Sequence, residues 1–347
     1  MKAALLKEDL SIKIGDVPTP ELKRDEVMVR VRACGVCATD VKKFTGASGT
    51  PHFPFILGHE PAGIVEAVGA DVDKDIQVGT RAAVAPVIVC GECDGCVSGL
   101  VAQEGMGMCE NYHVVGYSGD GAFAEYITVP PENVFPIPDA LSFRDAALVE
   151  PVAACANGVF KALKSPPGKA VVLGAGFMGL ASLALLKLLG AQVLIADLLD
   201  ERLETAKMLG ADAAVNPGKV DLMQMVMDFT GGKGADSVLC AVGVKSLTEQ
   251  GLAMLAKAGR LVLLASGPKG TKIEVDLNNA HYYHPVITGS VSYTAAQFSW
   301  VINQLAAGAI SSDLLVTHTG GLESVEKFLT LTKQQEGLKK VLLMGGD

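Results

Sequence analysis

The chain has 347 residues, of which 49% are hydrophobic, and this length allows two domains with sizeable cores. Its net charge of −9, without basic clusters, argues against a nucleic acid or an anionic membrane as partner. No apolar run reaches membrane-spanning length, and the charged residues from Lys7 to Asp9 do not fit a signal peptide. We therefore expect a globular protein of the cytoplasm.

Short strands and turns dominate the first third of the chain. Val27, Val29 and Val31 alternate with longer or polar side chains, which is the period of a half-buried strand. Further strands are expected over residues 64–68, 81–85 and 124–129. Many short strands separated by glycine and proline predict a small β-barrel.

The pattern changes near residue 143. Ser142 is expected to cap a helix that runs through residue 149, a second helix should cover 153–163, and residues 165–168 should break the chain. Beyond this break, strands alternate with helices, which predicts a doubly wound parallel sheet. The expected strands are 170–173, 192–196, 213–215, 236–240, 260–265 and 285–288, and the expected helices are 180–189, 200–209, 221–229 and 247–255. Helices over 295–306 and 322–332 and a strand over 339–344 complete the chain.

A glycine motif joins the first of these strands to its helix. Gly174 should make a tight turn, Gly176 should let the backbone approach a pyrophosphate, and Gly179 should let helix and strand pack closely. Asp197 ends the next strand, where a carboxylate accepts hydrogen bonds from ribose hydroxyls. The candidate dinucleotide-binding residues are Gly174, Gly176, Phe177, Met178, Gly179, Asp197 and Arg202. A glycine-rich turn in another kind of α/β unit is the alternative, and Arg202 is more simply a surface helix residue.

Four cysteines lie close together in the barrel region. Cys90, Cys93, Cys96 and Cys109 supply four thiolates within twenty residues, enough to close a tetrahedron around zinc without leaving an open position. Such a site is structural. A pair of disulfides, disfavoured in a reducing compartment, and an iron–sulfur cluster are the alternatives. Residues 97–108 form a long gap before the last cysteine, which either loops out or weakens the metal site.

Three separate segments carry further candidate metal ligands. They are Cys34-Gly35-Val36-Cys37-Ala38-Thr39-Asp40, Gly58-His59-Glu60-Pro61-Ala62-Gly63 and Glu150-Pro151. Together with the four-cysteine lobe, the segment 121–126 and the glycine motif, they resemble the zinc-dependent medium-chain dehydrogenase/reductase family, in particular its polyol and threonine dehydrogenase branches. The resemblance covers essentially the whole chain.

This resemblance implies a fold and a division into domains. The family's α/β architecture combines a GroES-like β-barrel catalytic domain with a Rossmann domain, a doubly wound parallel sheet. We expect the catalytic domain over residues 1–152, completed by 291–347, and the Rossmann domain over 153–290. The last strand is therefore expected to return to the barrel.

The resemblance also implies a catalytic zinc site. Cys37, His59 and Glu150 would be its ligands, and Glu60 would be a fourth ligand that exchanges with water or substrate. A zinc site with an open position polarises an alcohol and eases loss of its proton, after which a hydride passes to the nicotinamide. Thr39 matches the family residue that begins a proton relay, although a turn-capping threonine is the simpler alternative. Lys42 stands where relatives have a relay histidine, so water could replace this step.

The resemblance implies reversible oxidation of a secondary alcohol of a polyol, sugar or cyclitol. We expect NAD to be the oxidant, because Asp197 should repel the 2′-phosphate of NADP. An amino-alcohol dehydrogenase of the threonine type is the alternative within this chemistry. A zinc-free enone or quinone reductase and a non-catalytic nucleotide-binding protein are alternatives of other classes. Relatives are commonly dimers or tetramers, and we expect a tetramer. Candidate substrate-lining residues, equally compatible with core or surface roles, are Phe44, Tyr117, Val291 and His318.

Overall fold

The computed structural model describes residues 1–73, 75–164 and 167–345, and it separates into two compact units. Unit 1 comprises Met1–Pro151, Tyr293–Gly308 and the chain from Val316 onward. Unit 2 comprises Val152–Ser292 and Ala309–Leu315. The expected break at 165–168 includes residues 165 and 166, which lie outside the described part of the chain. Among the described residues, no helix is both long enough and apolar enough to cross a membrane.

Unit 1 is built around a seven-stranded sheet. Its strand order is β10-β6-β5-β3-β18-β17, and β9 pairs with β3. The strands are β3 (Val27–Val36), β5 (Glu60–Val68), β6 (Arg81–Val84), β9 (Tyr126–Val129), β10 (Val134–Pro136), β17 (Val316–Gly320) and β18 (Lys339–Leu343). The alternation predicted for β3 is confirmed, because Val27, Val29 and Val31 are buried in the barrel core.

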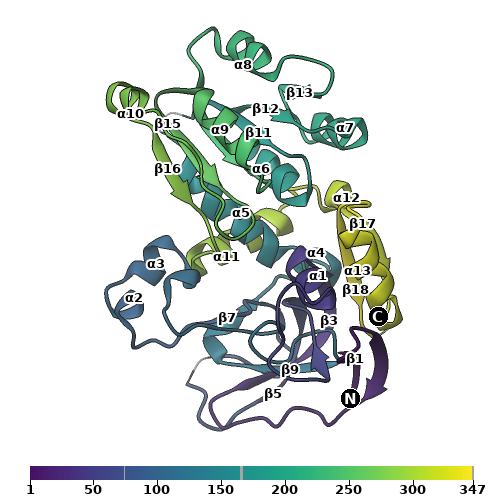
Figure 1. The fold of residues 1–347 in the computed structure, drawn as a ribbon. Coiled ribbons are helices and arrows are strands. Elements are labelled where there is room, and N and C mark those ends of the chain that lie inside the picture. Colours follow the sequence, from purple (N-terminus) through teal and green to yellow (C-terminus); the bar gives the residue numbers. More distant parts are fainter. Residues whose placement is uncertain (74, 165–166, 346–347) are drawn as a thin grey trace. The chain divides into compact units, whose positions relative to one another are not determined.

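The C-terminal strand β18 lies beside the N-terminal strand β3, as Figure 1 shows. The two strands pair antiparallel, so that Lys340 stands opposite Val36 and Leu342 opposite Cys34. The last segment of the chain thus completes the sheet of unit 1. Its buried Leu342 joins the same hydrophobic cluster as the valines of β3.

Several smaller elements of unit 1 have no counterpart in the sequence prediction. A three-stranded sheet has the order β2-β1-β4, and β7 pairs with β8. The strands are β1 (Lys2–Leu6), β2 (Ile12–Asp16), β4 (Phe55–Ile56), β7 (Val87–Ile88) and β8 (His113–Val114). Short helices α1 (Ala38–Phe44), α2 (Asp94–Val97) and α3 (Leu100–Glu104) and 3-10 turns η1 (Met106–Met108) and η2 (Pro131–Asn133) connect the strands. A fourth short helix, α4 (Phe143–Ala146), does lie within a predicted helix. Most span fewer than six residues, too few for a periodic signal.

The C-terminal helices of unit 1 follow the prediction closely. Helix α11 spans Ala295–Ala306, with Thr294 as its N-cap, and its bounds equal those predicted. The helix expected over 322–332 is a 3-10 turn, η3 (Leu322–Ser324), followed by α13 (Val325–Lys333).

Unit 2 contains a six-stranded sheet in which every neighbouring pair is parallel, as predicted. Its order is β13-β12-β11-β14-β15-β16. The strands are β11 (Lys169–Leu173), β12 (Gln192–Ala196), β13 (Ala213–Val215), β14 (Ala235–Cys240), β15 (Leu255–Leu263) and β16 (Val286–Gly289). The helices are α6 (Phe177–Leu188), α7 (Asp200–Met208), α8 (Leu222–Thr230), α9 (Lys245–Ala253), α10 (Leu277–Tyr283) and α12 (Ser312–Leu315). Because β12 and β14 flank β11 on opposite sides, the strand order reverses at β11, where such sheets bind ligands.

Some boundaries differ from the prediction. The single helix expected from residue 143 to 149 ends at Ala146, and a new helix, α5 (Val149–Ala162), begins before the predicted residue 153. Pro151 explains the interruption, because it has no N–H to continue the hydrogen bonding of α4 and is tolerated only in the first turn of α5. Residues Ala309–Leu315, assigned from the sequence to the first domain, belong to unit 2, where α12 packs against α6.

Candidate functional site

The four lobe cysteines converge on one point within unit 1. Their Sγ atoms lie 3.5 Å apart for Cys90–Cys109 and Cys93–Cys96, 3.9 Å for Cys93–Cys109 and 4.0 Å for Cys90–Cys96. A tetrahedron of sulfurs about 2.3 Å from a zinc ion has edges of about 3.8 Å, so the set fits one ion. All four thiols are free, which excludes the disulfide alternative for this conformation. The spacing also leaves no room for the several iron and sulfide atoms of a cluster.

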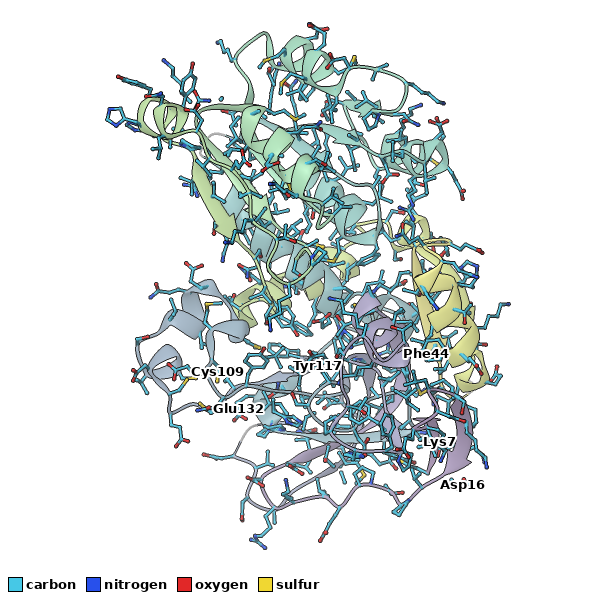
Figure 2. The ribbon with its side chains drawn as sticks, in the orientation of Figure 1. Lys7, Asp16, Phe44, Cys109, Tyr117 and Glu132 are labelled. Atoms are coloured by element: carbon cyan, nitrogen blue, oxygen red, sulfur yellow. The ribbon has the colours of Figure 1, made fainter. Side chains whose placement is uncertain are left out.

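Backbone amides donate hydrogen bonds to three of the four lobe sulfurs. The N–H of Glu110 donates to Cys93 Sγ, that of Cys93 to Cys90 Sγ and that of Cys90 to Cys109 Sγ. The hydrogen bond from Glu110, foremost among these interactions, lowers the pKa of Cys93 to about 6. Residues 97–108, the long gap before the last cysteine, include α3 and η1. Cys109, labelled in Figure 2, still lies within the cluster. The insertion therefore leaves the four-sulfur geometry intact.

A second cluster joins Cys37, His59 and Glu60. One ligand atom of each residue lies within 4.8 Å of the others. Cys37 follows the end of β3 and is the N-cap of α1, while Glu60 opens β5. The antiparallel register places Gly35 of β3 opposite Glu60 of β5. Residues far apart in sequence therefore meet at one end of two paired strands.

Asp40 organises this cluster, although the sequence analysis gave it no role. Its Oδ1 lies 3.1 Å from Nδ1 of His59, and the N–H of Gly58 donates to the same oxygen at 3.2 Å. Its Oδ2 accepts from the N–H of Cys37 at 2.9 Å. With Nδ1 engaged, Nε2 of His59 is the nitrogen left for a metal ion, as in a carboxylate–histidine–metal triad. The spacing from Cys37 to Asp40 resembles a helix capping box, the one local signal that could have identified this residue.

Lys339 holds Glu60 in place and was likewise not foreseen. Its Nζ donates to Oε1 at 2.7 Å and to Oε2 at 2.8 Å, and Glu60 is completely buried. Burial acts against the charge of Lys339, but Glu60 and Cys37 raise its pKa. A Cβ at Gly35 would lie 1.9 Å from Glu60 Oε2, so only glycine fits opposite this carboxylate.

Glu150 lies near the cluster but outside the set of mutually close ligand atoms. It is the second residue of α5 and is partly buried. Burial raises the pKa of Glu150 to about 7, His59 opposes this, and the carboxylate of Glu60 adds to it. The structure therefore groups Cys37 and His59 with Glu60, and it places Glu150 beside them.

Tyr293 is a further residue at this point that sequence reasoning did not identify. Its side chain is completely buried, and Oη has no hydrogen-bond partner among the described residues. Burial, followed by the neighbouring carboxylate of Glu150, raises the pKa of Tyr293 well above its usual range. Its carbonyl accepts the N–H of Met106 from the cysteine lobe at 2.8 Å. The lobe therefore contacts the residue that faces Glu150.

The residues predicted for the proton relay and for the substrate pocket lie on several different elements. Thr39 is partly exposed in the first turn of α1. The side chain of Lys42 is exposed to solvent on the same helix. Phe44, labelled in Figure 2, packs against the barrel core at the end of α1, and α1 contacts α13. His318 lies on β17 with its ring centroid 6.2 Å from that of Phe328. Val291 is 59% exposed in unit 2.

The glycine motif of unit 2 has the geometry of an anion-binding turn. Gly174 has a φ of +98°, and a Cβ at Gly179 would lie 1.8 Å from the carbonyl oxygen of Gly174. Gly176 is the N-cap of α6, and nothing lies within 4 Å of where its Cβ would be. Phe177 and Met178 form the first turn of α6. The motif thus leaves open space at a helix N-terminus, which fits a pyrophosphate.

Asp197 lies next to this turn at the end of β12. Its Oδ2 accepts the N–H of Ala175 at 2.7 Å, and its Oδ1 accepts the N–H of Leu199 at 2.9 Å. Arg202 is not a free surface residue, because its side chain is 17% exposed and Nη1 lies 3.8 Å from Asp197 Oδ2. The arginine therefore adjoins the carboxylate, in contrast to the simpler interpretation of its sequence position.

Comparison with known proteins agrees with this geometry. A family model described as the alcohol dehydrogenase GroES-like domain matches residues 23–139, and one described as zinc-binding dehydrogenase matches residues 178–307. The chain is 32% identical over 331 residues to sorbitol dehydrogenase of Bacillus subtilis (strain 168), covering 94% of this chain and 92% of the relative. The chain belongs to the zinc-binding alcohol dehydrogenase family.

Two further relatives extend over nearly the full length. L-threonine 3-dehydrogenase of Bacillus subtilis (strain 168) is 33% identical over 350 residues, covering 98% of each chain. A solved structure described as short chain alcohol dehydrogenase (rspB) of Escherichia coli CFT073, complexed with NADH, has a TM-score of 0.88 and 30% identity, covering 99% of each chain.

Membership of the family confirms several sequence predictions. The GroES-like barrel and the Rossmann sheet are the family's two folds, and the protein is a dehydrogenase that uses zinc and a nicotinamide dinucleotide. The four-cysteine lobe has the donor set and spacing of its structural zinc site.

The lobe generates a prediction about metal content. The purified enzyme should carry two zinc ions per chain, and Cys93→Ser should reduce this to one, because a hydroxyl is a poor replacement for a thiolate ligand. Loss of the ion should also lower the melting temperature by several degrees, since metal binding stabilises the folded lobe. Elemental analysis by mass spectrometry measures the content. Cys240→Ser, a buried thiol of β14 outside both clusters, should retain both ions. Two ions in the Cys93 variant would contradict the assignment.

Proposed function

We propose that this enzyme reversibly oxidises a secondary alcohol of a polyol, sugar or cyclitol to the ketone with NAD. The observation that carries the proposal is the convergence of Cys37, His59 and Glu60, with Asp40 behind the histidine and Glu150 beside the set. Thiolate, imidazole and carboxylate are the donors of catalytic zinc sites that keep an open position. The same donor set is a specific argument against a zinc-free reductase or a non-catalytic nucleotide-binding protein.

We propose Cys37 and His59 as constant ligands of the catalytic zinc, with Glu60 and Glu150 as the carboxylates that complete or vacate its coordination. Zinc at this place would supply Lewis-acid activation of the alcohol, and the nicotinamide would accept the hydride. Lys339 orients Glu60 through two hydrogen bonds, which would have to loosen for Glu60 to serve as a ligand. The position of Glu150 outside the close cluster favours it as the more mobile of the two carboxylates.

Thr39 is the candidate for the first proton transfer. Its position two residues beyond Cys37, partly exposed on α1, allows its hydroxyl to accept the proton of the substrate alcohol and pass it on. Because Thr39 is itself partly exposed, the proton can pass from its hydroxyl to solvent without a second side chain. Water therefore takes the part that a relay histidine would have.

The names of the relatives support the substrate class. Sorbitol dehydrogenase acts on a polyol by its name, and galactitol-1-phosphate dehydrogenase and 2R,3R-butanediol dehydrogenase are among the structural neighbours. All three names describe compounds with secondary hydroxyl groups. The L-threonine 3-dehydrogenase of Bacillus subtilis, at 33% identity, supports an amino alcohol as the second candidate.

Unit 1 is the proposed catalytic part and unit 2 the proposed nucleotide-binding part. We also propose a homo-oligomer, a tetramer in preference to a dimer. Within the described residues, the edge strand β16 of unit 2 has β15 as its one partner strand, and it exposes Val286 and Ile287 by 43% and 39%. Apolar edge strands need a cover, which a second subunit would provide. Because all eight cysteines are free thiols, a reducing compartment such as the cytoplasm is the proposed location.

The substrate class and the catalytic cluster are tested together. A panel of polyols, sugars, cyclitols, threonine and simple alcohols with NAD should give NADH absorbance with at least one polyol, sugar or cyclitol. Cys37→Ser and His59→Ala should each lower kcat by about a thousandfold or more, because loss of the ion removes several kcal/mol of transition-state stabilisation. His281→Ala, an exposed histidine of α10, is the matched control and should keep full activity. Near-normal turnover in both cluster variants would refute the assignment, and turnover of threonine alone would favour the second candidate.

The cofactor preference has its own test. Neighbours of this family have been solved with NADH and with NADP, so the local charge decides the question for this chain. Asp197 should repel a 2′-phosphate, and Asp197→Asn keeps one acceptor while removing the charge. The ratio of kcat/KM for NAD to that for NADP should fall by about tenfold or more in this variant. Asp200→Asn, at the exposed start of α7, should leave the ratio unchanged. A wild-type preference for NADP would overturn the proposal.

A further inference from the structure

Lys43 is a buried lysine without a carboxylate partner. Its side chain on α1 is only 2% exposed, and in the described part of the chain it has no ion pair within 4 Å. Nζ donates to the carbonyl oxygen of Gly49 at 2.6 Å. It also lies 4.3 Å from the ring centroid of Tyr117 and 5.1 Å from that of Phe55. Lysine is almost never fully buried unless its charge is paired.

Stability does not explain this arrangement. Removing an ammonium from water is costly, and one neutral carbonyl with two ring faces compensates the charge only in part. Burial accordingly lowers the pKa of Lys43, although the nearby Asp40 acts in the opposite direction. An apolar side chain of similar length would fill the same space without this cost. A costly buried charge that persists points to a functional role.

The segments around Lys43 are those that carry the candidate metal ligands. Helix α1 begins directly after Cys37, and Thr39 and Lys43 are four residues apart on the same helical face. Phe55 belongs to β4, four residues before His59. The ring of Tyr117 follows Gly116, which packs so closely on Gly58 that a Cβ there would lie 2.2 Å from the Gly58 carbonyl oxygen.

The ammonium is close to solvent even though it is covered. Gly49, its hydrogen-bond acceptor, is exposed, and Tyr117, labelled in Figure 2, is 39% exposed. An ammonium has three N–H donors, and only one of them has an oxygen acceptor among the described residues. Rotation of the Tyr117 ring would open a path to the remaining donors, so a ligand group could replace the weak ring contact with a charge-assisted hydrogen bond.

We propose that Lys43 recognises an anionic group, a carboxylate or a phosphate, on the alcohol substrate. This inference rests on the proposed function and narrows its substrate class to charged polyol or sugar derivatives. Because a neutral substrate leaves the buried charge unpaired, the enzyme should discriminate against it. We assign no role in anion recognition to the neighbouring Lys42, because its side chain is exposed and its charge is hydrated with or without substrate.

The test compares matched substrates of one carbon skeleton. For a series of four- to six-carbon polyols, kcat/KM with NAD is measured for the neutral polyol, the corresponding aldonic acid and the terminal phosphate monoester. For the wild type, kcat/KM should be about tenfold or more higher with one of the two anionic substrates than with the neutral polyol. Whether that substrate is the aldonic acid or the phosphate monoester shows which anionic group Lys43 recognises. Lys43→Met should reduce this selectivity ratio to near one, Lys43→Gln should do the same, and Lys42→Met should leave it unchanged.

Each outcome decides the proposal. No turnover of any alcohol would remove the proposed function and this inference with it, whereas turnover of neutral polyols without anionic preference would overturn this inference alone. A fall in kcat/KM by the same factor for neutral and anionic substrates in Lys43→Met would assign Lys43 to structure or proton transfer and also overturn it. Thermal unfolding provides the second readout. Lys43→Met should melt at the wild-type temperature or higher, because it removes a buried charge that is compensated only in part. A lower melting temperature would indicate that Lys43 stabilises the fold and would overturn the proposal.

Discussion

The register between β3 and its neighbours is the constraint on which the candidate active site depends. Gly35 pairs with Glu60 of β5, and Val36 pairs with Lys340 of β18. Three chain segments separated by up to about 300 residues therefore reach the same end of one sheet. A slip of one residue in either pairing would turn the reactive side chains to the opposite face, because the side-chain period of a strand is two. The fold of unit 1 thus fixes the site before any metal is bound.

Charge is the second determinant of this site. The cluster gathers the thiol of Cys37 and the carboxyl groups of Asp40, Glu60 and Glu150 in largely buried positions, and the ammonium of Lys339 contacts one of them. Lys339 and the imidazole of His59 lie beside these acids, and Asp40 raises the pKa of His59 against the effect of its burial. A divalent cation bound at this cluster would add positive charge and favour ionised donors.

Local patterns in the sequence predicted much of the fold. The bounds of β12, β13 and α11 match the prediction, because strong apolar periods and glycine or capping signals mark their ends. The cysteine spacing predicted the four-sulfur cluster, and the glycine motif predicted the turn before α6. Both predictions were possible because the residues of each motif lie close together in the chain.

The candidate active site was less accessible to sequence reasoning, because its partners are distant in the chain. Nothing near Lys339 marks it as the partner of Glu60, which is 279 residues away. The same holds for Tyr293 beside Glu150, and for Lys43, whose burial arises from rings on two other segments. Such roles follow from strand register and packing, which a single sequence does not encode locally.

We propose that a thiolate and an imidazole from separate segments share one divalent ion in unit 1. Anomalous diffraction at the zinc absorption edge, from crystals of the purified enzyme, tests it most directly. We expect one peak among the four lobe sulfurs and a second peak about 2.0–2.3 Å from Cys37 Sγ and His59 Nε2. A zinc peak in the lobe alone, with Cys37 and His59 turned away from each other, would contradict it.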